Sequence, residues 1–324
     1  MREESAGQAG DASVTTTVAA HGTACRVCGS GDTVKKKDGE LERPLEPKDF
    51  QITDDRYGVT LSLWKCRHCH FLFAEGDEIA TLTALYERLN DPAYEQSQDT
   101  RSLQMSWLLD KALRRRPWAS SLLDIGAGAG LLVAQARQRG LEAVGVEPSR
   151  SLVEAAQAIN GVDLLQGVFP HPELADRRFD IIFLVDVIEH VAEPVELLRD
   201  CAQALAPTGI LVVVTPDVGS LAARLLGRRW WHFRLAHVGY FNHRSLPKAL
   251  ERAGLRLAST ARAKWFFRLS YLAERLERYL PVGWINRLSR KSKLLNRLYE
   301  LVIPLNLFDS FLVFAETAAK DGAA

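Results

Sequence analysis

The chain has 324 residues, of which 47% are hydrophobic, and a formal net charge of +1 at pH 7. This length predicts two domains or one enlarged domain, and the apolar fraction is sufficient for a full hydrophobic core. The small net charge excludes a protein drawn to nucleic acid by its overall field. The lack of any run of about 18 apolar residues argues against a membrane-spanning helix.

The N-terminal residues 1–23 are small and polar, and they lack the apolar segment that a signal peptide needs. We expect a disordered lead-in there. Five cysteines are present, and four of them form two C-x-x-C pairs in the sequences CRVC and CRHC. An odd number of cysteines in this arrangement favours a reducing compartment and a bound metal over a disulfide framework. We therefore expect a cytoplasmic protein.

The two C-x-x-C turns predict a closed, structural zinc site, because each turn can direct two thiolates at one tetrahedral ion. A redox dithiol is the competing interpretation, although it favours a single pair near a βαβ unit. His68 and His70 are alternative ligands. Cys201 occupies an apolar helix position, and we expect it in the core. The expected zinc ligands are Cys25, Cys28, Cys66 and Cys69.

Residues 24–75 are expected to form this metal-organised module, and residues 76–118 a helical linker that ends near Pro117. From residue 119 to 324 strands and helices alternate, which predicts a parallel sheet covered by helices. The segment FDIIFLVDV is apolar throughout, as expected for a strand buried on both faces. In chain order we expect strands at 121–126, 141–147, 162–169, 179–187, 210–217, 255–263 and 308–317, and helices at 130–140, 151–159, 194–207 and 245–254.

Two stretches exceed a minimal fold of this kind. Residues 218–244 are rich in tryptophan, arginine and histidine, and residues 264–300 hold nine Lys or Arg and three Glu. A basic, amphipathic helix pair at 266–307 can lie on an anionic membrane surface, here the inner surface. A lid, a dimer face and an ordinary helical hairpin are the alternatives. The apolar stripe of this pair has helical spacing and consists of Phe266, Leu269, Ala273, Leu276 and Leu280.

Three glycines follow the first strand of the sheet in the sequence DIGAGAG. Glycine is needed where the backbone must approach a ligand or adopt a positive φ, and the first N–H groups of the next helix suit a carboxylate or phosphate. Glu147 lies 21 residues after Gly126 at the end of the next strand, where it can accept hydrogen bonds from both hydroxyls of a ribose. The pattern predicts a nucleoside-containing cofactor. An NAD-type site, which has G-x-G-x-x-G, is the competing interpretation.

This D-x-G-x-G-x-G stretch resembles motif I of the class I S-adenosylmethionine (SAM)-dependent methyltransferases, and FDIIFLVDVIEHVAEP resembles their fourth-strand motif. The resemblance implies a Rossmann-like seven-stranded sheet, with the glycine turn on the methionine part of SAM and the glutamate on its ribose. Where the family usually has an acidic residue near the adenine, this chain has glutamine and glycine. The expected cofactor-binding residues are Asp124, Gly126, Ala127, Gly128, Gly130, Glu147, Pro148, Gln166, Gly167 and Asp186.

The four-cysteine module with LWKCRHCHFLFAE, followed by an LY-containing helix and motif I, is itself recognisable. It resembles the zinc-ribbon-bearing methyltransferases among sugar C-methyltransferases and envelope-polysaccharide enzymes. The second knuckle of that group usually ends in glycine, and this chain has His70 there, so its turn is expected to differ slightly.

The segment GRRWWHFRLAHVGYFNHRSL resembles the H-x-x-Y-F segment of the same group, which normally lies over the sulfonium. The resemblance implies His237 as a general base with Tyr240 as a helper, since an oxygen or carbon acceptor must lose a proton. His190 is the second candidate. Structural, hydrogen-bonded histidines are the alternative interpretation, and Trp230 and Trp231 are expected either to wall the acceptor pocket or simply to pack.

These inferences predict SAM-dependent methyl transfer to a hydroxyl or activated carbon of a small-molecule, sugar or lipid-linked acceptor. The expected partners are that substrate, a peripheral membrane contact through residues 266–307 and another copy of the chain, but not nucleic acid. The alternatives are an RNA base methyltransferase with a zinc module and a non-catalytic zinc-ribbon adaptor. The mixed charges of residues 24–75 and the lack of an N/D-P-P-Y/F signature argue against the RNA enzyme.

Overall fold

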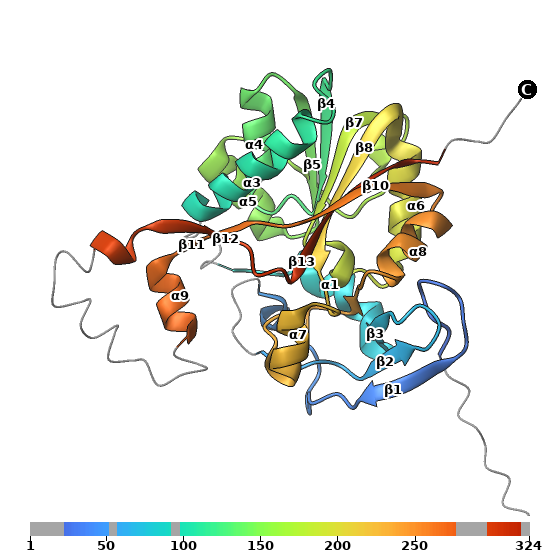
Figure 1. Cartoon of the computed structure of the whole chain (residues 1–324). Helices are drawn as coiled ribbons and strands as arrows, with labels where there is room; N and C mark the ends of the chain where they lie inside the picture. Colours follow the sequence, from blue (N-terminus) through green and yellow to red (C-terminus); the bar gives the residue numbers. More distant parts are fainter. Residues whose placement is uncertain (1–22, 52–56, 92–97, 277–296, 319–324) are drawn as a thin grey trace, which may run out of the picture.

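The computed structural model describes residues 23–51, 57–91, 98–276 and 297–318. Its centre is a seven-stranded sheet made of β4 Ser121–Ile125, β5 Glu142–Glu147, β6 Leu165–Gln166, β7 Phe179–Val185, β8 Leu205–Pro216, β10 Leu255–Arg262 and β13 Ser310–Thr317. The strand order is β10-β13-β8-β7-β4-β5-β6, in which β13 runs antiparallel to both of its neighbours and the pairs from β8 to β6 are parallel (Figure 1). The mostly parallel seven-stranded sheet expected from the sequence is confirmed.

Helices cover both faces of this sheet (Figure 1). On one face lie α3 Gln98–Leu113, α4 Leu131–Gln138 and α5 Arg150–Asn160, and on the other α6 Pro194–Ala204 and α8 Ser245–Arg252. The sequence sets the ends of α5, because the Ser149 hydroxyl accepts a hydrogen bond from the Leu152 amide at 3.3 Å and Gly161 ends the helix with φ of 64°. Each face therefore has its own hydrophobic core.

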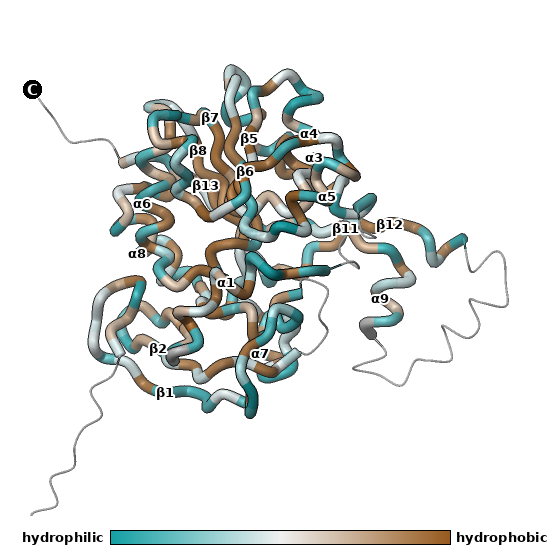
Figure 2. Tube along the Cα trace, turned by 180° about the vertical axis from the view of Figure 1, so that it is seen from behind, coloured by the Kyte–Doolittle hydropathy of each residue, from teal (hydrophilic) through white to brown (hydrophobic). Residues whose placement is uncertain are grey.

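The central strand β7 is buried on both faces. Four successive side chains from Ile181 to Leu184 are fully buried, and two of them belong to each core. Figure 2 shows the hydrophobic residues concentrated along the inner strands of the sheet. The continuous apolar run of this segment thus predicted its position correctly.

The structure corrects two predicted boundaries in the sheet domain. The third strand was expected over 162–169, but β6 contains only Leu165 and Gln166, because Gly167 turns away with φ of 146°. The helix expected over 194–207 ends at Ala204, and β8 begins at the next residue, where Leu205 aligns with Phe179 of β7.

A second sheet of four strands lies below the first and joins the cysteine module to the rest of the chain (Figure 1). Its strands are β1 Thr33–Lys37, β2 Leu63–Cys66, β3 Leu72–Ala74 and β9 Gly239–Tyr240. The last strand comes from the 218–244 stretch and pairs antiparallel with β3. The remaining short helices are η1 Pro47–Phe50, η2 Asp77–Thr81, α1 Leu82–Glu87, η3 Pro172–Leu174, η4 Ile188–His190, α7 Leu221–Leu226 and η5 Gly227–Arg229.

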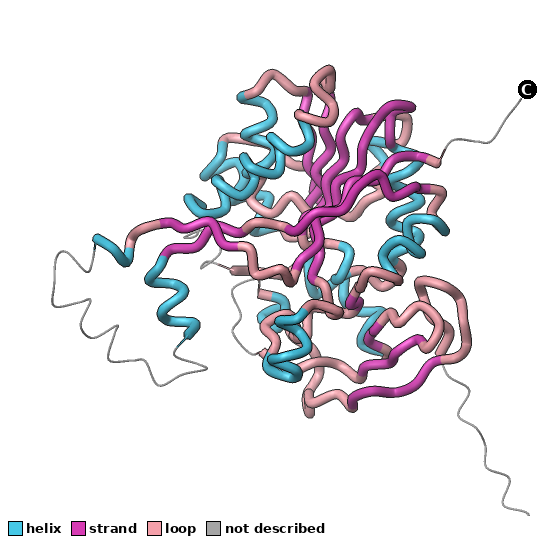
Figure 3. Tube along the Cα trace, in the orientation of Figure 1, coloured by secondary structure: helices cyan, strands magenta, loops and turns pink. Residues whose placement is uncertain are grey.

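The segment before the last strand forms an arm that extends from the body (Figure 3). It contains β11 Trp265–Arg268 and β12 Val302–Leu305, which pair antiparallel, and α9 Leu269–Leu276. The prediction that Phe266 starts a helical stripe is wrong, because the aromatic run Trp265–Phe267, which has a high strand propensity, pairs with Ile303–Leu305 of β12. Leu280 lies outside the described residues. Among the residues described, no helix is long and apolar enough to cross a membrane.

Candidate functional site

The glycine turn joins β4 to α4 at the carboxyl edge of the sheet, where open α/β sheets bind ligands. Gly126, Gly128 and Gly130 all have positive φ, at 72°, 55° and 72°. A Cβ atom on Gly126 would lie 2.6 Å from a methyl group of Val187. A side chain at this position would therefore clash with Val187, and the left-handed backbone itself favours glycine.

Glu147 ends β5 and is bound to this turn. Its carboxylate accepts hydrogen bonds from the Gly128 amide at 2.8 Å and from the Ser149 amide at 2.9 Å. Burial raises the pKa of Glu147 to about 7, against the lowering effect of these two amides. Burial, together with the nearby Glu147, raises the pKa of Asp124 to about 8. Each carboxylate oxygen can accept a second hydrogen bond, so Glu147 remains able to bind hydroxyl groups.

The other predicted cofactor residues gather around the same edge. Gln166 lies opposite Glu147 in the strand register, and the Gly167 amide donates to the Glu147 carbonyl at 3.0 Å. Asp186 follows β7 with a positive φ of 54°, and its buried Oδ1 has no hydrogen-bond partner among the described residues. Burial raises the pKa of Asp186 to about 6. The predicted cofactor residues thus lie at the carboxyl ends of the neighbouring strands β4, β5, β6 and β7, at one edge of the sheet.

The side chains of three acid–base residues meet beside Asp186. Glu189, His190 and His237 bring side-chain oxygen or nitrogen atoms within 4.8 Å of one another. The His190 and His237 rings are perpendicular, with centroids 4.7 Å apart. The Glu189 side chain accepts a hydrogen bond from the Thr215 hydroxyl at 2.8 Å, while its Oε1 has no partner in the described part of the chain.

The two histidines differ in their hydrogen bonds. His190 Nδ1 lies 2.9 Å from the Ala236 carbonyl and also contacts the Tyr86 hydroxyl, and burial lowers the pKa of His190 to about 3. His237 is 5% exposed, and its Nδ1 has no partner among the residues described. Burial lowers the pKa of His237 well below its usual value, so its ring is neutral and Nδ1 can accept a proton.

Tyr240 and Trp230 are both fully buried next to the histidines. The Tyr240 hydroxyl donates to the Arg234 carbonyl at 3.3 Å, and burial raises the pKa of Tyr240 above its usual value. Its ring centroid is 6.1 Å from that of His237. Trp230 is fully buried, whereas Trp231 is half-buried. Tyr86 of α1 contacts His190, a role that was not expected from the sequence, although the LY-containing helix itself was recognised.

The four cysteines of the C-x-x-C pairs lie together. Cys25 Sγ is 3.6 Å from Cys69 Sγ, and Cys28 Sγ is 3.5 Å from Cys66 Sγ. All four sulfur atoms lie within 4.8 Å of one another. A hydrogen bond from Cys69 holds the pKa of Cys25 at about 5. Cys201 is separate and fully buried in α6, as expected for a core residue.

The cysteine cluster is connected directly to the strand that follows His237. Beyond the β3–β9 pairing, the Asn242 side chain donates to the His70 carbonyl at 2.7 Å, and Phe71 packs on Phe241 with ring centroids 4.8 Å apart. His70, which replaces the usual glycine of the knuckle, has a positive φ of 61°. The module is therefore part of the same structure that holds the histidine cluster.

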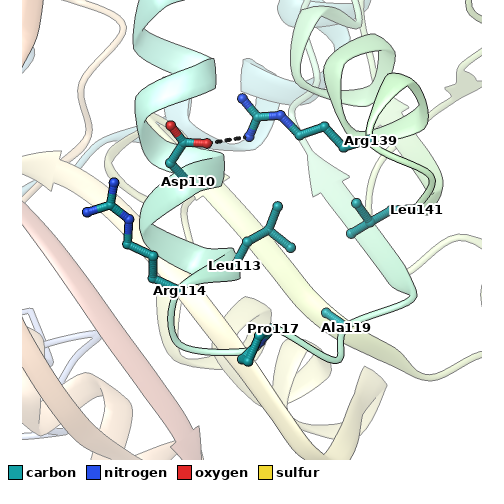
Figure 4. Close-up of a pocket in the computed structure, with 7 residues that line it drawn as sticks. All are labelled: Asp110, Leu113, Arg114, Pro117, Ala119, Arg139 and Leu141. Carbon is teal, nitrogen blue, oxygen red and sulfur yellow. Dashed lines mark ion pairs between the residues drawn. The ribbon is translucent and has the colours of Figure 1, made fainter.

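A hollow with a volume of about 560 Å³ lies elsewhere. Its residues precede β4 and β5, at the amino ends of these strands, and an ion pair of 2.8 Å joins Asp110 to Arg139 across it (Figure 4). It is remote from the carboxyl edge, so we do not assign the cofactor there. The remaining lining residues are Leu113, Arg114, Pro117, Ala119 and Leu141.

A family model of methyltransferase domains matches residues 97–260, slightly more than half of the chain. The chain belongs to this family. It is similar to the ubiquinone biosynthesis O-methyltransferase of Rhodopseudomonas palustris strain TIE-1, with 35% identity over 122 residues, which cover 36% of this chain and 44% of that protein. The corresponding protein of Bradyrhizobium sp. strain ORS 278 is 34% identical over 177 residues, covering 50% and 66%. The methyltransferase described here thus spans less than two thirds of these relatives.

Among solved structures, a SAM-dependent methyltransferase from Thermotoga maritima aligns with 69% of this chain and 94% of its own, at 20% identity and a TM-score of 0.44. A score this low supports no conclusion about activity. The family match identifies a methyltransferase domain, and the mostly parallel seven-stranded sheet agrees with the class I fold expected from the sequence.

The residues of this methyltransferase fit SAM, the cofactor that the sequence predicts. The buried Asp186 Oδ1 has no partner among the described residues and needs a hydrogen-bond donor, which the amino group of SAM can supply. Glu147 stands at the distance along the chain expected for a ribose contact. The individual cofactor contacts of these residues remain predictions.

Proposed function

We propose that this methyltransferase transfers a methyl group to a hydroxyl or activated carbon of a small-molecule, sugar or lipid-linked acceptor, with His237 as the general base. The observation that carries the proposal is His237 Nδ1, a buried nitrogen without a partner in the described structure. It lies beside Glu189 and His190 at the carboxyl edge of the sheet. Buried polar atoms normally have hydrogen-bond partners, so an acceptor group is a natural partner for this nitrogen.

The tautomer of His237 supports this role. The nearby backbone of His232 raises the pKa of His237 slightly against the larger effect of burial. Nδ1 has no partner among the described residues, and we infer that it carries the free lone pair. His190 is less suited, because its Nδ1 is already engaged by Ala236 and Tyr86. We assign it, with Tyr240, to positioning.

The chemistry balances with these groups alone. His237 Nδ1 takes the proton that the acceptor atom loses, and the lone pair of that atom forms the bond to the methyl carbon. SAM, when bound, supplies a methyl group on a sulfonium, and the electron pair of the broken carbon–sulfur bond stays on sulfur. The buried surroundings of His237 exclude water and align the acceptor.

We also propose that Cys25, Cys28, Cys66 and Cys69 bind one zinc ion. A tetrahedral zinc with bonds of about 2.3 Å places its sulfur ligands about 3.8 Å apart, and the sulfur–sulfur distances of 3.5 and 3.6 Å are compatible with that. This module, the H-x-x-Y-F segment and motif I support membership of the zinc-ribbon group of sugar C-methyltransferases and envelope-polysaccharide enzymes. The name of the curated relatives supports a hydroxyl acceptor instead, so both acceptor atoms stay in the proposal.

Transfer of a radiolabelled methyl group tests the proposal. The wild-type protein and His237→Gln are incubated with labelled SAM and a cell extract, which is then separated into lipid, glycan and RNA fractions. We expect the wild type to label the glycan or lipid fraction and the variant to label neither. Label confined to RNA would contradict the proposal and favour the base methyltransferase, and no label in any fraction would also count against it.

A further inference from the structure

A histidine–carboxylate pair that the sequence did not reveal lies beside His237. His232 Nε2 lies 3.4 Å from Asp309 Oδ2. The two residues are 77 positions apart, since His232 belongs to the loop before β9 and Asp309 directly precedes β13. The His232 ring stacks beside the His237 ring at 5.9 Å, with an angle of 18° between their planes.

The backbone fixes Asp309 at this place. Its carbonyl accepts a hydrogen bond from the Asp217 amide at 2.7 Å, which ties the start of β13 to the end of β8. Asp217 is in turn bound to Arg262 at 2.8 Å. The Asp309 side chain is only 2% exposed, whereas that of His232 is 19% exposed. His232 is therefore the member of the pair that a ligand can reach.

Many buried polar atoms around this pair have no hydrogen-bond partner among the described residues. Twelve buried side-chain oxygen or nitrogen atoms in the described residues have no partner, and six of them belong to this one cluster. Asp309 Oδ2 is one of the six, because its 3.4 Å contact with His232 Nε2 does not have the geometry of a hydrogen bond. The other five are Asp186 Oδ1, Glu189 Oε1, Trp230 Nε1, His237 Nδ1 and Ser310 Oγ. Since buried polar groups are normally satisfied, the concentration of these five atoms indicates that a ligand completes them.

We propose that His232, held by Asp309, contacts the acceptor and binds a hydroxyl group next to the atom that receives the methyl group. This inference rests on the proposed function, in which His237 is the base. Asp309 acts through His232 and is a positioning residue, as the carboxylate of a histidine–aspartate pair commonly is. The 3.4 Å separation is long for a hydrogen bond, and such contacts shorten when a substrate is bound.

The chemistry of the neighbours selects a hydroxyl. When Asp309 accepts a hydrogen bond from the Nε2–H group of His232, the other ring nitrogen of the neutral His232 is a hydrogen-bond acceptor. Trp230, whose ring centroid is 5.0 Å from that of His232, offers only a donor through Nε1. A group that satisfies both must donate one hydrogen bond and accept another. A hydroxyl does so, whereas an ether or a ketone oxygen only accepts.

Steady-state kinetics with three variants tests this assignment. The probe is the glycan or lipid fraction that the wild-type enzyme labels, supplied in a dilution series. For His232→Asn we expect kcat/KM for this fraction to fall about tenfold to hundredfold, as for the loss of a buried hydrogen bond. Affinity for S-adenosylhomocysteine, measured by calorimetry, should stay within about twofold, because His232 does not touch the cofactor. His243→Asn is the matched control, an exposed histidine of the same segment.

Two aspartate variants separate positioning from folding. Asp309→Asn retains an oxygen that can hold His232, so its activity should exceed that of Asp309→Ala. If Asp309→Ala does not fold, the partly exposed His232 still decides the outcome. A His232→Asn enzyme with the same kcat/KM as the wild type and the control would overturn the inference. If His237→Gln is inactive in the same assay, the proposed function still stands. A wild type that labels no fraction would instead contradict the proposed function itself.

Discussion

Glu147 combines a structural and a binding role in one carboxyl group. It accepts hydrogen bonds from two amides of the cofactor turn, and burial raises its pKa to about 7. Ribose hydroxyls donate to the ionised carboxylate, so cofactor binding favours loss of its proton. The pKa of the free protein therefore lies within the range where cofactor affinity depends on pH.

We expect affinity for S-adenosylhomocysteine to weaken as the pH falls below 7, by at most about tenfold per pH unit. Calorimetric titrations on both sides of the Glu147 pKa measure this effect. Glu147→Gln should bind about 1–3 kcal/mol more weakly at high pH and lose this dependence. Any dependence from Asp124, whose pKa is raised to about 8, should remain in the variant. Equal affinity at both pH values in the wild type would contradict the ribose contact.

His237 is expected to be neutral throughout the ordinary histidine range, because burial lowers its pKa well below the usual value. The kcat of the wild type should therefore not fall as the pH is lowered through that range. His237→Gln should reduce kcat by about 10²–10⁴, the usual contribution of a general base, with cofactor affinity unchanged. A fall in wild-type kcat near the ordinary histidine pKa would show that another histidine is the base.

At the scale of elements, β9 is the point where the cysteine module and the acceptor side meet. It pairs with β3, which begins three residues after Cys69, and the Val238 amide donates to the Glu189 carbonyl at 2.8 Å. If the four cysteines hold zinc as proposed, loss of the metal would release β3 and with it β9, which follows His237 and contains Tyr240. The glycine turn lies in another part of the fold and does not depend on this contact.

Cys66→Ser is therefore expected to lose zinc and methyl transfer while retaining affinity for S-adenosylhomocysteine. Hydrogen exchange of residues 238–241 should accelerate in the same variant. Cys201→Ser is the matched control, since that cysteine is buried in α6 away from the cluster. A Cys66→Ser protein with normal zinc content would mean that the ligand set is wrong.

Gly145 shows how tightly β5 packs behind the cofactor turn. A Cβ atom there would lie 2.6 Å from Leu164 Cδ2 and 2.8 Å from the Ala127 Cβ. We expect Gly145→Ala to lower the free energy of unfolding by about 1–3 kcal/mol, as overpacking usually does. Gly140→Ala, which meets open space but has φ of 83°, should cost about 1 kcal/mol through backbone strain. Thermal or urea unfolding measures both variants against the wild type, and a Gly145→Ala protein as stable as the wild type would contradict the packing.

At the scale of the whole molecule, the sequence predicted what is local and periodic. The positions of the sheet strands along the chain followed from alternating apolar segments, and the glycine turn from residues that need positive φ. It did not predict the β3–β9 pairing or the His232–Asp309 pair, because each joins segments far apart in the chain through very few residues. Phe266 was misplaced for a related reason, since its partner strand lies more than 30 residues away.

The charge of the molecule is unevenly distributed. Residues 264–300 carry nine basic and three acidic side chains, so a net charge of +6 stands against −5 for the rest, given the total of +1. Exposed apolar side chains accompany the described part of the arm, among them Leu298 and Leu301. We propose that this arm contacts an anionic membrane surface. Binding to anionic vesicles should weaken with salt and be absent with neutral vesicles, and no binding at low salt would contradict the proposal.

The most direct test of the account is a crystal structure with S-adenosylhomocysteine. We expect the ligand at the turn between β4 and α4, with its ribose hydroxyls within hydrogen-bond distance of Glu147 and its amino group near Asp186. Electron density for the ligand at another place would contradict this cofactor site, and so would side chains that occupy the site at saturating ligand. The proposed chemistry depends on this site.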